Sequence, residues 1–144
     1  MSTNANKALI RRFYDEVWNQ GNLAVADEVF AADYVRHDHR PGAVPPGPEG
    51  QKRIAETFRS AFPDGRMSIE LMVAEGSFVV AQWTIEGTHS GTWAAISATG
   101  ARVRFGGVNI FRLTDGKVVE IWNHRDDLGL MQQLGAPSVS GHEV

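Results

Sequence analysis

The chain has 144 residues, a formal net charge of −3 at pH 7 and no cysteine. This length suits a single domain over residues 1–144 that folds without metal or disulfide support, and the lack of cysteine excludes thiol catalysis and thiolate metal sites. Basic residues are scattered, and neither a signal peptide nor a membrane-spanning run is recognisable. We therefore expect a cytoplasmic protein whose partner is a small uncharged molecule, with no nucleic acid and no membrane involved.

Two helices are predicted at the start of the chain. Apolar residues at helical spacing predict a long amphipathic helix over residues 4–20, with Thr3 or Asn4 as its cap and Gly21 as its end. Asn22 can cap a short second helix that directly follows.

A strand-like run at residues 34–37 leads into a loop that is rich in proline and glycine. This loop is long for a connection within one domain, so it is interpreted as a lid or a rim. Pro48 suits the first turn of a third helix, which Pro63 ends.

The chain after residue 66 is predicted to be mostly strand. Four strands are expected, at residues 67–75, 78–88, 102–113 and 117–126. An Asp115-Gly116 hairpin joins the last two, and Asp127 can cap a final short helix that runs through Leu134. Helices followed by antiparallel strands predict an α+β domain whose helices cover one face of a sheet.

The last strand carries the main candidates for chemistry. Side chains alternate along a strand, so Trp122, His124 and Asp126 should share one face, with Asn123 and Arg125 on the other. The first face combines a candidate base, a second titratable group and an aromatic wall. A helix cap is the alternative role for Asp126, although Asp127 is better placed to cap. For His124 the alternative is a polar group at the rim of the sheet.

A second cluster, His37-Asp38-His39, could be interpreted as part of a metal site. His39 leads directly into the proline-rich loop and no third ligand is obvious, so no metal site is predicted. Asp38 could equally close a turn through its side chain.

Several segments, in order along the chain, resemble the SnoaL-like polyketide cyclase branch of the NTF2-like superfamily. The resemblance rests on FYDEVWNQGN at 13–22, FAADYVRHD at 30–38, Gly50, FPD at 62–64, DGKVVEIW at 115–122 and DDLGLMQQLG at 126–135. It implies a cone-like α+β barrel, in which a curved antiparallel sheet wraps around the long N-terminal helix and a cavity opens at one end. Fold alone does not fix function, because this superfamily includes enzymes and pure binding modules.

The resemblance also implies a chemistry, which is intramolecular aldol closure of an aromatic polyketide ester without metal or cofactor. An aspartate of the final strand moves the proton in such cyclases, and Asp126 matches it by position. His124 would then bind the substrate oxygen or tune the aspartate, beside Trp122. The family often has tryptophan where Arg125 stands, a difference expected to affect sheet packing or dimerisation. His37 and Asp38 match a pair found near the cavity mouth.

Two other functions remain open at this stage. Tyr14, Asp38 and Asn109 resemble the oxyanion tyrosine, proton-shuttling aspartate and second donor of the ketosteroid isomerase branch. Alternatively, the cavity binds a small hydrophobic or aromatic carbonyl compound without catalysis. In either case we expect a homodimer. Apolar residues such as Val79, Ile85 and Ile110 should point outward from the convex face of the sheet, where contact with water is costly and a second copy of the chain would cover them.

Overall fold

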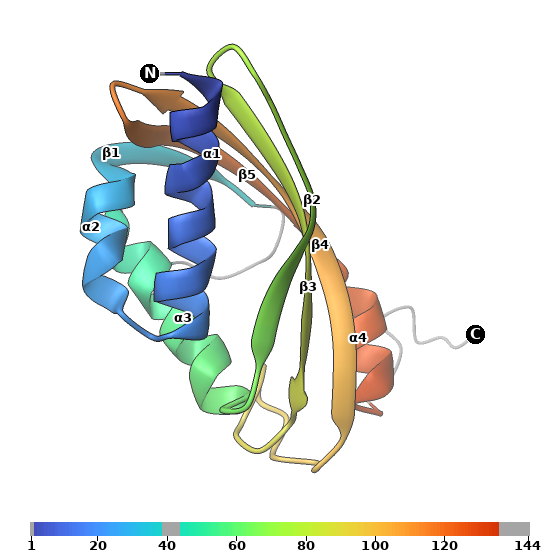
Figure 1. Cartoon of the computed structure of the whole chain (residues 1–144). Helices are drawn as coiled ribbons and strands as arrows, with labels where there is room; N and C mark the ends of the chain where they lie inside the picture. The colour runs from blue at the N-terminus through green and yellow to red at the C-terminus, as the bar shows by residue number, and fades with distance from the viewer. Residues whose placement is uncertain (1, 39–43, 136–144) are drawn as a thin grey trace.

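The computed structural model describes residues 2–38 and 44–135 (Figure 1). Its helical segments are α1 (Thr3–Arg12), η1 (Phe13–Asn19), η2 (Leu23–Val25), α2 (Ala26–Val29), α3 (Pro48–Ala61) and α4 (Asp127–Gln133). Its strands are β1 (Phe30–His37), β2 (Arg66–Glu75), β3 (Phe78–Thr88), β4 (Arg102–Thr114) and β5 (Lys117–Arg125). The predicted α+β architecture, with a curved sheet against the N-terminal helix, is confirmed.

The N-terminal helix begins one residue earlier than the sequence indicated. The Ser2 hydroxyl accepts a hydrogen bond from the Ala5 backbone N–H at 3.0 Å, so Ser2, rather than Thr3 or Asn4, is the cap. Beyond Arg12 the helix widens into the π-helical segment η1, where the Gln20 N–H donates to the Asp15 carbonyl, five residues back, at 3.0 Å. Widened turns of this kind are frequent at functional sites.

The end of η1 is held by α3. The Arg59 guanidinium donates to the backbone carbonyls of Trp18 and Asn19, at 2.9 and 2.8 Å. A cation at this position satisfies carbonyls that have no helical partner and complements the negative end of the helix dipole. Gly21 follows with a φ of 74°, and a Cβ there would lie 2.6 Å from the Arg59 Nε.

The sheet has the order β1-β5-β4-β3-β2. The neighbours β2 to β5 are antiparallel, and β1 joins as a parallel edge strand beside β5. The predicted hairpin is confirmed, because Asp115 and Gly116 have φ values of 51° and 77°, as a tight two-residue turn requires. The strand predicted at residues 34–37 is longer, because β1 already begins at Phe30.

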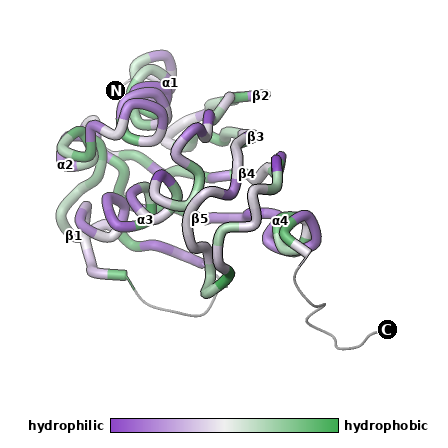
Figure 2. Tube along the Cα trace, turned by 90° about the horizontal axis from the view of Figure 1, so that it is seen from below, coloured by the Kyte–Doolittle hydropathy of each residue, from purple (hydrophilic) through white to green (hydrophobic). Residues whose placement is uncertain are grey.

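One face of the sheet packs against α1, η1 and α3, whereas α4 lies on the opposite face (Figures 1 and 2). The Phe111 ring on β4 contacts the rings of Phe13 and Tyr14, with centroids 6.3 and 6.2 Å apart, which identifies the concave, core-facing side. Val79 and Ile85 are 0 % and 4 % exposed and lie on this concave side. The prediction that they point outward is therefore wrong.

Within residues 2–38 and 44–135, no helix is long and apolar enough to cross a membrane.

Candidate active site

Three side chains are linked by hydrogen bonds across the concave side, from η1 through β4 to β5. The buried Tyr14 hydroxyl donates to Asn109 Oδ1 at 2.6 Å, and Asn109 Nδ2 donates to Asn123 Oδ1 at 2.7 Å. Burial raises the pKa of Tyr14 well above its ordinary value, so the hydroxyl keeps its proton and acts as a donor. Two of the residues proposed for the isomerase-like scheme, Tyr14 and Asn109, are thus in direct contact.

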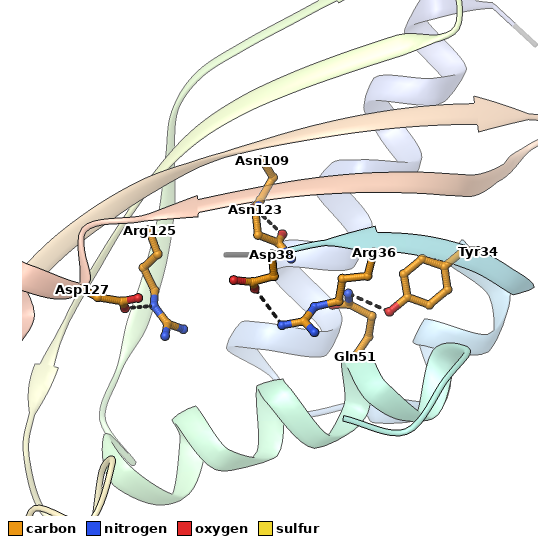
Figure 3. A network of polar contacts seen from close by, with 8 residues as sticks. All are labelled: Tyr34, Arg36, Asp38, Gln51, Asn109, Asn123, Arg125 and Asp127. Atoms are coloured by element: carbon orange, nitrogen blue, oxygen red, sulfur yellow. Dashed lines mark hydrogen bonds and ion pairs between the residues drawn. The ribbon is translucent and has the colours of Figure 1, made fainter. Parts of the chain in front are cut away.

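A buried carboxylate lies at the end of β1, beside β5. A terminal nitrogen of Arg36 lies 2.7 Å from the Asp38 carboxylate, whose side chain is 7 % exposed. In Figure 3, Asp38, Asn123 and Arg125 point from the strands into the space above α3. Below them, Gln51 of α3 donates to the Tyr34 hydroxyl at 3.1 Å.

Two hollows meet at this cluster. The inner cavity is small, about 40 Å³, and is lined by Phe13, Trp18, Gln51, Ile54, Phe58, Met67, Trp83, Asn109, Ile121, Asn123, His124 and Arg125. A wider, open outer hollow of about 580 Å³ shares Trp83, Asn123, His124 and Arg125 with it and adds, among others, Asp38, Asp126 and Asp127. The outer hollow has the volume of a site for a small organic ligand, whereas the inner cavity alone does not.

Arg125 reaches into the inner cavity rather than away from it. Its guanidinium carbon lies 5.0 Å from the centre of the Phe58 ring and 5.1 Å from that of Trp93, and its Nε lies 2.5 Å from an Asp127 carboxylate oxygen. The expectation that Arg125 affects sheet packing or dimerisation placed it on the face away from the site, and that placement is wrong. A planar cation that rests on two aromatic rings instead forms part of the cavity wall.

Two indole groups complete this wall. Trp18 and Trp83 both line the inner cavity, and their buried Nε1–H groups have no hydrogen-bond partner among residues 2–38 and 44–135. The Trp83 ring lies against Gly107, where a Cβ would come within 2.5 Å of the ring. Glycine at this position of β4 therefore makes room for the indole.

Asp126 occupies a different place from that predicted, whereas His124 lies at the edge of the sheet beside both hollows. Asp126 is exposed, and its carboxylate accepts the Gly129 N–H at 2.9 Å, so Asp126 caps α4, not Asp127. His124 is exposed on the face of β5 that points away from α1. Both residues border the outer hollow, and His124 also lines the inner cavity. Their catalytic role stays a prediction.

Trp122 and His37 lie on the convex face. Their rings stack with centroids 5.0 Å apart, and His37 Nε2 lies 2.7 Å from a Glu120 carboxylate oxygen. This contact with His37, followed by that with Arg112, lowers the pKa of Glu120. The prediction that Trp122 walls the cavity beside Asp126 is wrong, because the buried Ile121 and the half-buried Asn123 occupy the inward positions.

Sequence reasoning missed the residues that fill those inward positions. Asn123 and Arg125 were assigned to the opposite face, and Trp83 and Arg36 were not singled out. The available signal was the two-residue period of the strands. Asn123 and Arg125 follow the apolar Ile121 at every second position of β5, and Arg36 and Asp38 follow Tyr34 in the same way at the end of β1.

No group of three or more histidine, aspartate or glutamate side chains close enough to hold a metal ion occurs in the described ranges 2–38 and 44–135. His39, the second histidine of the cluster considered above, lies outside the described residues.

Comparisons with known proteins agree on one family. The family model described as SnoaL-like polyketide cyclase matches residues 8–134. Aklanonic acid methyl ester cyclase DauD of Streptomyces sp. strain C5 is 31 % identical over 136 residues, which is 90 % of this chain and 81 % of that protein. Nogalonic acid methyl ester cyclase of Streptomyces nogalater is 26 % identical, covering 83 % and 90 %. The structure of TsrD from Streptomyces laurentii superposes with a TM-score of 0.85 at 29 % identity, covering 94 % of this chain and 98 % of TsrD.

Proposed function

This chain belongs to the SnoaL-like polyketide cyclase family, and we propose that it closes a ring in a polyketide-type ester by an intramolecular aldol reaction in which Asp38 moves the proton. The two cyclases named above act on the methyl esters of aklanonic and nogalonic acid. Together with the family resemblance of the sequence, they support a small aromatic or hydrophobic carbonyl substrate here.

The burial of Asp38 carries this proposal. Its side chain is 7 % exposed and borders the hollow that contains Asn123 and Arg125. The ion pair with Arg36 favours the charged carboxylate, which is the form that can accept a proton. A base shielded from bulk water and next to hydrogen-bond donors is the arrangement expected for proton abstraction beside a carbonyl.

The proposed reaction needs only one proton carrier. The Asp38 carboxylate takes a proton from the carbon next to one carbonyl, and the carbanion forms a carbon–carbon bond with a second carbonyl of the same molecule. Asp38 then returns the proton to the new alkoxide, so the product is an isomer of the substrate and the ester is retained. Donors in the cavity wall, such as the Asn123 amide, stabilise the negative oxygen during the reaction.

Asp126 is the alternative base, because it matches the family's aspartate by position and borders the outer hollow. Two observations favour Asp38 over it. Asp126 is exposed, and one of its carboxylate oxygens already accepts the backbone N–H of Gly129. A capping carboxylate that gains a proton would weaken this hydrogen bond and with it the start of α4.

An isomerase-like reaction would use the same Asp38 but would need a Tyr14 hydroxyl directed at the substrate. The hydrogen bond from Tyr14 to Asn109 directs that hydroxyl at a neighbouring side chain instead. This contact supports the cyclase over the isomerase.

We also propose that the protein forms a homodimer through the convex face. This face carries Val35, Leu71, Val73 and Phe78, which are 51 %, 56 %, 50 % and 41 % exposed. Large apolar side chains on one face of a sheet are costly in water, and a symmetric dimer would cover them.

The test of the function is ring closure by the purified protein on an aromatic polyketide methyl ester. Because the product has the mass of the substrate, retention time and absorbance are the readouts, with the Asp38→Asn and Asp126→Asn variants assayed in parallel. Ring closure that depends on Asp38 supports the proposal. Isomerisation of a β,γ-unsaturated ketone without ring closure of the ester would favour the isomerase, and uptake of the ester without turnover would favour a binding protein.

A further inference from the structure

Two arginines lie around the space above α3, and they differ in what they stabilise (Figure 3). Arg36 lies 2.7 Å from the Asp38 carboxylate, so its charge favours the state before Asp38 takes up a proton. Only stabilisation that is greater in the transition state than before it increases the rate of a reaction. The negative charge that leaves Asp38 in the proposed proton transfer therefore needs a second group to stabilise it where it arrives.

Arg125 provides a cation on the same wall as Asp38. Asn123 and Arg125 are two residues apart on the inward face of β5, which places them about 7 Å from each other along the strand. β1 runs parallel to β5 in a register that brings Asp38 beside Asn123. Asp38 and Arg125 both border the outer hollow. A carbonyl compound in this hollow can therefore present a carbon atom to Asp38 and the neighbouring oxygen to Arg125.

The orientation of the Arg125 guanidinium is fixed by its neighbours. Its central carbon lies 5.0 and 5.1 Å from the ring centres of Phe58 and Trp93, and the side chain is 13 % exposed. A guanidinium carries five N–H donors in one plane, and the contact with Asp127 uses the one on Nε. Donors that are fixed in advance and shielded from water stabilise a developing negative charge more than the same groups do in water.

Packing alone does not require a cation at this position. An apolar side chain of similar size would contact the Phe58 and Trp93 rings without losing the hydration of a charge, and such replacements of buried ion pairs are often neutral or stabilising. The charge of Arg125 becomes useful when a negative group forms in the hollow that Arg125 borders.

We propose that Arg125 is a catalytic residue that donates hydrogen bonds to the enolate oxygen formed during ring closure. Asp38 takes the proton from carbon, and the electron pair of the broken C–H bond forms the enolate, whose negative oxygen lies at the Arg125 guanidinium. When the carbon–carbon bond forms, the charge passes to the second carbonyl oxygen, which receives the proton back from Asp38. This role rests on the proposed function, because the enolate arises in that reaction.

The test uses 4-nitrophenol, whose ionised form carries a negative aromatic oxygen like that of an enolate and is yellow, whereas its neutral form is nearly colourless. The protein carries Asp38→Asn, because asparagine is neutral like the base after it has taken up the proton. Absorbance titration with excess protein gives the apparent pKa of the bound probe. The probe undergoes no turnover, so this measurement does not depend on ring closure.

We expect the Asp38→Asn protein to lower the apparent pKa of bound 4-nitrophenol by about one unit or more, as a neighbouring opposite charge typically does. Adding Arg125→Met should abolish this shift, whereas adding Arg125→Lys, which keeps the charge, should retain part of it. Arg125→Gln, which is neutral but polar, provides the same comparison if Arg125→Met does not fold. Arg104→Met is the matched control, because the Arg104 side chain is 58 % exposed, pairs with Glu86 and lines neither hollow.

Turnover provides the second measurement. With Asp38 intact, Arg125→Met should lose about a hundred- to a thousandfold in kcat on a cyclisable aromatic polyketide ester, with little change in KM, as removal of one donor to a negative oxygen typically does. Arg104→Met should leave both constants unchanged.

An unshifted probe in the Asp38→Asn protein, a shift that survives Arg125→Met, or an equal change in Arg104→Met would overturn the proposal. A fall in kcat without any probe shift would also overturn it, because Arg125 would then act through the shape of the wall. Absence of ring closure by the wild type would refute the cyclase, whereas a probe shift that depends on Arg125 would still identify Arg125 as the residue that binds the negative oxygen.

Discussion

Arg36 and Asp38 lie two residues apart at the end of β1 and pair at 2.7 Å, with the Asp38 side chain 7 % exposed and that of Arg36 22 % exposed. A cation beside a carboxylate this far out of water stabilises the fold, because an uncompensated buried charge is strongly destabilising. The pair therefore links the stability of the fold to the chemistry proposed for Asp38.

The first prediction concerns removal of the cation. Arg36→Met should lower the free energy of unfolding at pH 7 by about 2–4 kcal/mol, because it removes the cation that lies 2.7 Å from the buried Asp38 carboxylate. Urea denaturation measures this change. The double variant Arg36→Met with Asp38→Asn should recover most of the loss, since the buried charge is then absent as well.

Arg12→Met is the control for this experiment. Arg12 pairs with Glu16 and Glu28 at the surface, where solvent screens the charges, so its removal should change the free energy of unfolding much less. If Arg36→Met costs no more than Arg12→Met, Asp38 is not held in the way described.

The second prediction concerns alkaline pH. Burial raises the pKa of Tyr14 above that of the unfolded chain, so the unfolded state loses its proton first as the pH rises. The stabilising contribution is fully present below about pH 10 and declines above it. Urea denaturation between pH 9 and pH 11 should therefore show a shallower decline for Tyr14→Phe than for the wild type.

Tyr34, whose pKa burial also raises, is the other tyrosine of the chain and provides the comparison. Because its shift is smaller, Tyr34→Phe should change the slope less than Tyr14→Phe does. Parallel curves for the wild type and Tyr14→Phe would contradict the buried, protonated state of Tyr14.

The third prediction concerns the turn that carries Trp93. Ala94 and Ala95 have φ values of 47° and 67°, and Trp93 and Ile96 exchange backbone hydrogen bonds of 2.9 and 2.7 Å across them. Each alanine in this left-handed region costs about 1 kcal/mol or more, and Asn-Gly is the pair that such turns prefer. Ala94→Asn with Ala95→Gly should raise the free energy of unfolding by about 1 kcal/mol, measured by urea denaturation.

Ala98→Gly, outside the turn, is the control and should not stabilise the protein, because glycine increases the conformational freedom of the unfolded chain. A double variant of Ala94 and Ala95 that is less stable than the wild type would show that the turn is not strained.

The fourth prediction concerns assembly. Sedimentation at micromolar concentration should give about twice the 15.8 kDa of one chain. Val73→Lys should shift the protein towards the monomer, because it places a charge among the exposed apolar side chains of the convex face. Ala24→Lys, on the helical side, should leave the dimer intact. A wild-type monomer under these conditions would contradict the proposed interface.

The sequence predicted those parts of the fold in which local signals agree. Pro48 at the first turn of α3, the alternation along β3 and the Asp115-Gly116 turn each fix an element from its own residues. The parallel edge strand β1 was harder to predict, because its pairing with β5 depends on residues nearly ninety positions away in the sequence.

The orientation of the candidate site was not predictable in the same way. Alternation shows which residues of β5 share a face, but both faces carry large apolar side chains, Ile121 on one and Trp122 on the other. Only tertiary packing decides that Ile121 points inward. Because β5 ends at Arg125, Asp126 lies at the start of α4 and caps that helix. The prediction of Asp126 as a base had the strand extend one residue further, to Asp126 itself.

The most direct test of the central claim compares the turnover of Asp38→Asn with that of Asp126→Asn on a cyclisable aromatic polyketide ester. Asp38→Asn should lose roughly a hundred- to ten-thousand-fold in kcat with little change in substrate binding, as removal of a general base typically does. Asp126→Asn, which keeps a side chain able to cap α4, should stay within about tenfold of the wild type. Near-normal turnover in Asp38→Asn together with a collapse in Asp126→Asn would contradict this account and identify Asp126 as the base.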